Sequence, residues 1–107
     1  NTNYKVAEYI LTTAQKTDKV FAWSNDSSAI YSLSRHLPPT KYVADYHFND
    51  FSSPDEIITV LETERPRFII VSKNSFPFAQ LDTFLIENYS IISQIDTTNI
   101  WISSKNE

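Results

Sequence analysis

Residues 53–71, SPDEIITVLETERPRFIIV, contain a helix signal followed directly by a strand signal. Ser53 can cap a helix whose first position is a proline, and two acidic residues follow in the first turn, which together make a capping box. A second proline, Pro66, pushes the residue before it out of the helical region. The stretch therefore predicts a helix over 53–64 and a buried, central parallel strand over 68–71.

Upstream of this segment, the sequence repeats the order of helix and strand. Apolar residues recur at helical spacing over 4–16, which predicts an amphipathic helix with Asn3 as its N-cap. The short apolar run 19–23, Lys-Val-Phe-Ala-Trp, is typical of a buried strand. A second helix through 29–33 and a second strand over 42–44 are expected to follow.

Downstream, the pattern changes from alternation to a terminal hairpin. A helix that opens at residue 75 or 76 should end at Asn88, which tolerates a left-handed cap. The runs 90–95 and 100–103 flank a polar turn and predict an antiparallel hairpin.

Together these elements predict a single α/β domain that spans residues 1–107. We expect a small, mostly parallel sheet flanked by helices, with Rossmann-like topology but no nucleotide site, and with a C-terminal β-hairpin. The strand over 19–23 should be central and lie next to the strand over 68–71, and the hairpin should lie at an edge.

Composition narrows the possible functions. The chain has 107 residues, a net charge of -4 and a pI near 5, so it has no electrostatic reason to bind nucleic acid. It contains no Cys and no Gly, which excludes a thiolate nucleophile and every recognisable glycine-rich phosphate loop. We expect no cofactor and no metal. The chain also lacks Met and any long apolar run, which favours a soluble domain excised from a larger protein.

Polar residues cluster in the segments that should follow the parallel strands. Ligands bind outside the carboxyl ends of such strands, so these residues could bind a small anionic or sugar ligand. Solvated loops are polar by default, and that remains the alternative interpretation. For Trp23 and Trp101, packing in the core or against a partner is favoured over stacking on a sugar. The candidate ligand-binding residues are Asn25, Asp26, Arg35, His36, Asp45, His47 and Lys73, and no catalytic residue is assigned.

Six stretches of the chain follow one another in an order that we also find in a known family: 6–10, 18–23, 29–38, 41–42, 46–47 and 53–71. By these stretches the chain resembles the C-terminal extracytoplasmic domains of multi-spanning, lipid-linked-sugar glycosyltransferases. Those enzymes are similar to protein mannosyltransferases and to the aminoarabinose transferases of lipid A. The resemblance covers about residues 4–103 and consists of loose patterns of residue type.

The resemblance implies a parent enzyme with a polyprenyl-phosphate sugar donor and with catalytic acids between membrane helices. This chain would then be a non-catalytic accessory or acceptor-facing domain on the extracytoplasmic face of a membrane. Its partners would be the transmembrane portion of the same polypeptide and a sugar, protein or lipid acceptor. The alternative hypothesis is a stand-alone α/β binding module for a small anionic or sugar ligand, and a small intracellular enzyme ranks last.

Overall fold

The computed structural model describes residues 2–15, 18–23, 42–46, 52–72 and 79–104. Within these ranges the helices are α1 (Thr2–Thr13), α3 (Pro54–Glu64) and α4 (Ala79–Asn88). The strands are β1 (Lys19–Trp23), β2 (Tyr42–Tyr46), β3 (Phe68–Val71), β4 (Tyr89–Ile95) and β5 (Thr98–Ser103). The predicted helix through 29–33 lies outside the described residues.

The strands form one mixed sheet in the order β2-β1-β3-β5-β4. Strand β1 pairs in parallel with β2 and with β3, whereas β5 pairs antiparallel with both β3 and β4. The α/β class is confirmed, but the prediction of a mostly parallel, Rossmann-like sheet is wrong. The C-terminal hairpin supplies two of the strands of this sheet. Its strand β5 pairs with β3 along the whole of that strand and makes half of the sheet antiparallel.

The predicted neighbours in the sheet are largely confirmed. Strand β1 lies beside β3, and the hairpin forms one end of the sheet. The middle position belongs to β3, with β1 next to it. Both strands are buried almost throughout, as their continuous apolar runs indicate.

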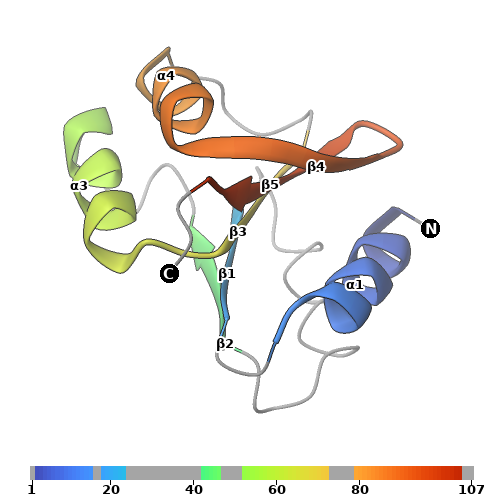
Figure 1. Cartoon of the computed structure of the whole chain (residues 1–107). Helices are drawn as coiled ribbons and strands as arrows, with labels where there is room; N and C mark the ends of the chain where they lie inside the picture. Colours follow the sequence, from blue (N-terminus) through green and yellow to red (C-terminus); the bar gives the residue numbers. More distant parts are fainter. Residues whose placement is uncertain (1, 16–17, 24–41, 47–51, 73–78, 105–107) are drawn as a thin grey trace.

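Alternating side chains of the sheet belong to two separate cores, one on each face. Helix α1 covers one face, and α3 and α4 cover the other (Figure 1). The α1 core consists of Val6, Ala7, Ile10, Val20, Ala22, Phe68, Ile70 and Ile100. The α3–α4 core consists of Phe21, Trp23, Ile57, Leu61, Ile69, Leu81, Phe84, Leu85 and Tyr89.

The ends of α3 follow the local sequence closely. The side chain of Ser53 accepts a hydrogen bond from the Glu56 backbone N–H at 3.3 Å, so the predicted N-cap is confirmed. In a capping box the Glu56 carboxylate would accept from the backbone N–H of Ser53. Here this carboxylate accepts from the Ser52 hydroxyl at 2.5 Å. At the other end, Arg65 adopts a left-handed conformation with φ 46° and its N–H donates to the Leu61 carbonyl.

Two predicted caps are wrong. Helix α1 begins at Thr2, so Asn3 lies inside its first turn. Helix α4 ends at Asn88 as expected, but that residue is not left-handed, and β4 begins at the next position. Among the described residues only Arg65 and Asp96 have positive φ, and Asp96 lies in the two-residue turn between β4 and β5. A chain without glycine thus places charged residues where glycine is usual.

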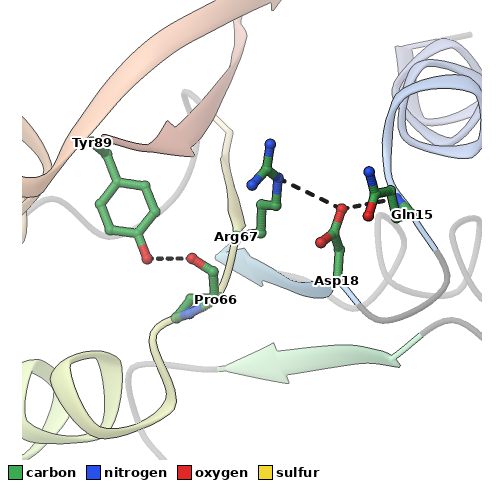
Figure 2. A network of polar contacts seen from close by, with 5 residues as sticks. All are labelled: Gln15, Asp18, Pro66, Arg67 and Tyr89. Atoms are coloured by element: carbon green, nitrogen blue, oxygen red, sulfur yellow. Dashed lines mark hydrogen bonds and ion pairs between the residues drawn. The ribbon is translucent and has the colours of Figure 1, made fainter. Parts of the chain in front are cut away.

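Polar contacts fix the entry of the chain into β3 (Figure 2). The Tyr89 hydroxyl donates to the Pro66 carbonyl. The Asp18 carboxylate lies 3.6 Å from the Arg67 guanidinium and accepts from the Gln15 backbone N–H at 2.8 Å. These contacts connect the starts of β1, β3 and β4, and they account for Asp18 and Arg67 as structural residues.

Candidate functional site

The site predicted from the sequence depends on the carboxyl ends of the three parallel strands. These ends are level in the sheet, because Trp23 pairs with Tyr46 on one side and with Val71 on the other. The three strands therefore end side by side. Six of the seven candidate residues come after these strand ends in the sequence and lie outside the described residues: Asn25, Asp26, Arg35, His36, His47 and Lys73.

Asp45 is the one candidate on a described strand. It lies in β2, opposite Ala22 of β1, one position before the end of the strand. Its side chain lies outside the described part of the chain. A small-ligand site built from these seven residues therefore stays a prediction.

Other sequence-based interpretations can be compared directly with the structure. Trp23 is buried in the α3–α4 core and Trp101 packs against that core, as predicted. Across the described ranges, no group of three His, Cys, Asp or Glu side chains could hold a metal ion. None of the described helices has the length and apolar character needed to cross a membrane.

A groove lies between α3 and α4, and residues of both helices line it. Its volume is about 550 Å³, within the usual range of binding sites. One stripe of each helix forms its walls, with residues spaced three or four apart so that they share a face. From α3 the lining residues are Asp55, Ile58, Thr59 and Glu62, and from α4 they are Ala79, Gln80, Thr83, Phe84, Glu87 and Asn88.

The walls of this groove are acidic. Asp55, Glu62 and Glu87 contribute three carboxylates, and the described lining includes no Lys or Arg. All three residues are exposed, so their charges face solvent at the rim. The apolar part of the lining comes from half-buried Ile58 and from Phe84, which also belongs to the core beneath. The groove thus combines an apolar floor with a negative rim.

The direction of the two helices strengthens the negative potential at one end. The groove meets Asp55 near the start of α3 and Ala79 at the start of α4. A smaller recess of about 210 Å³ lies beside the opposite helix ends, at Arg65 and Asn88. Both helices therefore point their C-termini, the negative ends of their dipoles, toward this end of the groove. Glu62 and Glu87 lie in the same half of their helices, so cations are favoured there.

Side chains in the walls of the groove form local hydrogen bonds to the backbone of their own helix. The Thr59 hydroxyl donates to the Asp55 carbonyl at 3.0 Å, and the Asn88 amide donates to the Phe84 carbonyl at 2.9 Å. The recess shares Glu62, Phe84 and Asn88 with the groove, so the two concavities are continuous. Arg65 adds one positive charge at this far end.

Sequence reasoning missed this groove. The two stripes are visible in the sequence, since 55, 58, 59 and 62 repeat at helical spacing, as do 80, 83, 84 and 87. The missing information was that α3 and α4 lie next to each other on one face, because the structure assigns α1 alone to the other face. A periodic stripe with acids at its margins is otherwise indistinguishable from a solvated helix surface.

Comparison with known proteins corrects the family resemblance drawn from the sequence. No curated protein and no solved structure matches the chain. A family model matches residues 2–105, and this family is not one of glycosyltransferase domains. The resemblance was wrong, and with it the assignment to a membrane glycosyltransferase, because the order of helices and strands carries no information about chemistry. By this match over nearly its whole length, the chain belongs to the family described as "Putative competence-induced protein Ccs4 C-terminal domain".

Proposed function

We propose that this chain is a non-catalytic, protein-binding domain of a competence-induced protein, and that its α3–α4 groove binds a basic, amphipathic helix of a partner. The observation that carries the proposal is the acidic rim around an apolar floor in this groove. Recognition of a helix in a groove between helices is a common mode of peptide binding, in which apolar anchors enter the groove and charges match at its margins.

The rim decides the charge of the partner. Glu62 and Glu87 repel anions, and the helix C-termini nearby add to the negative potential. A nucleic acid or an acidic peptide is therefore disfavoured, while Lys and Arg side chains of a partner can pair with the carboxylates. Because the carboxylates are exposed, each pair contributes modestly, and their main effect is on specificity and association rate.

The floor decides the shape of the partner. Ile58 and Phe84 offer apolar surface between the two rows of polar groups. A helix with Leu or Ile along one face and Lys along both flanks satisfies both requirements at once. The groove accommodates the few side chains on one face of such a helix, which would lie over α3 and α4 as a further layer.

The family name supports a role within a larger protein. It describes a C-terminal domain and a protein induced in competence, and it mentions no reaction. A domain that contributes a binding surface to such a protein fits this description. The partner itself is defined here only by its chemistry.

The test uses a synthetic amphipathic helix made of Lys and Leu, titrated into the chain by calorimetry and by NMR. We expect saturable binding with shifts at Ile58, Thr59 and Thr83, and weaker binding as salt is raised. The same peptide with Glu in place of Lys should not bind. Absence of binding, or shifts confined to α1, would contradict the proposal.

A matched pair of variants separates the groove from general acidity. Glu87→Gln removes one rim charge and should weaken binding about twofold to fivefold, the effect of one exposed ion pair. Glu8→Gln removes an equally exposed carboxylate from α1, on the other side of the sheet, and should leave affinity unchanged. Equal loss in both variants would mean that net charge alone attracts the peptide.

A further inference from the structure

The outermost strand of the hairpin half of the sheet, β4, presents a second surface that the groove does not involve. It is the last strand in the order β2-β1-β3-β5-β4, so no described strand pairs with its outer side. The outer side of an edge strand presents a regular row of backbone N–H and C=O groups, which another strand can pair with. The stretch of β4 from Ser90 to Ile95 is long enough to form a ladder with another strand.

The composition of β4 is unusual for an exposed edge. Its sequence, YSIISQI, contains no charged residue and no proline, although these are the usual means by which soluble proteins prevent edges from pairing. Ile91 and Ile92 lie at 52% and 39% exposure. A β-bulge between Ile91 and Ser93 interrupts the ladder of this strand, and two neighbouring isoleucines, Ile91 and Ile92, are both exposed there.

The other edge of the sheet differs in the feature that matters for self-association. Strand β2 includes one charged residue, Asp45, and charged residues on an edge strand disfavour pairing with another strand. β4 carries no charge in a chain whose net charge is -4. Two copies that repel through their acidic surfaces can therefore approach without like-charge contacts at β4.

We propose that β4 pairs with β4 of a second copy of this chain, antiparallel across a twofold axis, so that two sheets become continuous. A twofold axis between identical strands in one sheet requires antiparallel pairing, and β4 already pairs in this way with β5 on its inner side. The pairing covers Ile91 and Ile92 and satisfies the outer backbone groups. Ile91 and Ile92 line neither the groove nor the recess beside it, so the pairing does not involve the proposed peptide site.

The test measures the mass of the chain by analytical ultracentrifugation from micromolar to millimolar concentration. We expect a monomer–dimer equilibrium. Ile91→Lys places a charge on the edge and should raise the dimer dissociation constant about tenfold or more, which corresponds to about 1.4 kcal/mol. Ile86→Lys is the matched control, because Ile86 is still more exposed, at 73%, but lies on α4. This control should dimerise like the unchanged chain.

Amide hydrogen exchange gives a second readout that does not depend on the variants. Amides of β4 should become protected as concentration rises, and this gain should be lost in Ile91→Lys. Circular dichroism confirms that both variants are folded. A monomer at every concentration would overturn the proposal, and so would β4 protection that does not change with concentration or a dimer that Ile86→Lys disrupts as strongly as Ile91→Lys.

Discussion

The two faces of the sheet are covered in different ways, although the same strands supply both. Along β1, Val20 and Ala22 belong to the core under α1, whereas Phe21 and Trp23 belong to the core under α3 and α4. The α1 face is mainly aliphatic and needs one helix. The opposite face carries larger aromatic side chains. Two helices, α3 and α4, cover it (Figure 1), and a groove lies between them.

This difference explains why a groove forms on the face that α3 and α4 cover. A single helix packed on a flat face leaves only its own outer surface exposed. Two helices on one face form a valley along their line of contact, since side chains fill the space beneath but not above it. In this chain the valley is where Asp55, Glu62 and Glu87 gather. The α3–α4 face therefore carries the proposed binding function and the α1 face serves stability.

The largest expected loss of stability comes from a substitution in the core under α1. Ile10 is fully buried between α1 and the sheet, so Ile10→Ala should lower the free energy of unfolding by about 2–5 kcal/mol. Chemical denaturation monitored by circular dichroism measures the change. At temperatures where the variant stays folded, its affinity for the Lys/Leu peptide should match that of the unchanged chain. A clear loss of peptide affinity in the folded variant would show that the two faces are not functionally separate.

A smaller loss of stability is expected when the N-cap of α3, on the groove side of the sheet, is removed. Ser53→Ala removes the acceptor for the Glu56 N–H and should lower the free energy of unfolding by about 1 kcal/mol. Ser52→Ala is the control, since the Ser52 hydroxyl donates to the exposed Glu56 carboxylate and the loss of this exposed contact should have a much smaller effect. Thermal unfolding of both variants measures the difference. A Ser53→Ala variant as stable as the unchanged chain would mean that the cap does not stabilise the first turn of α3.

The parts of the fold that sequence reasoning predicted are those fixed by local signals. Residues 53–71 combine a cap, a helical repeat, a proline stop and an apolar strand, and α3 and β3 follow them almost residue by residue. The turn around Asp96 likewise predicted a hairpin, which the structure confirms. Such signals act within a few residues, so they are visible without knowing the rest of the chain.

Features that depend on distant pairing were not predictable in the same way. The position of β5 beside β3 joins residues about thirty positions apart, and no local pattern distinguishes it from a hairpin attached only at an edge. The groove required knowing which helices share a face. The family resemblance failed for a related reason, because the order of elements in 6–23 and 53–71 reflects the fold class and not the chemistry of a site.

The smallest expected effect concerns the two residues with a left-handed backbone, Arg65 and Asp96, which lie near opposite faces of the sheet. Arg65 ends α3 on the groove face, and Arg65→Gly should raise the free energy of unfolding by about 0.5 kcal/mol, since glycine removes the Cβ clash but enlarges the unfolded ensemble. Asp96 lies near the other face, where its carboxylate accepts from the Thr2 hydroxyl at the start of α1. Aspartate tolerates the left-handed region better than arginine does, and Asp96→Gly also removes this contact, so its net effect should be close to zero. Parallel urea titrations of the two variants measure the difference in their free energies of unfolding. If Asp96→Gly raised this free energy more than Arg65→Gly did, backbone strain at the hairpin would limit the stability of the domain more than strain at the end of α3.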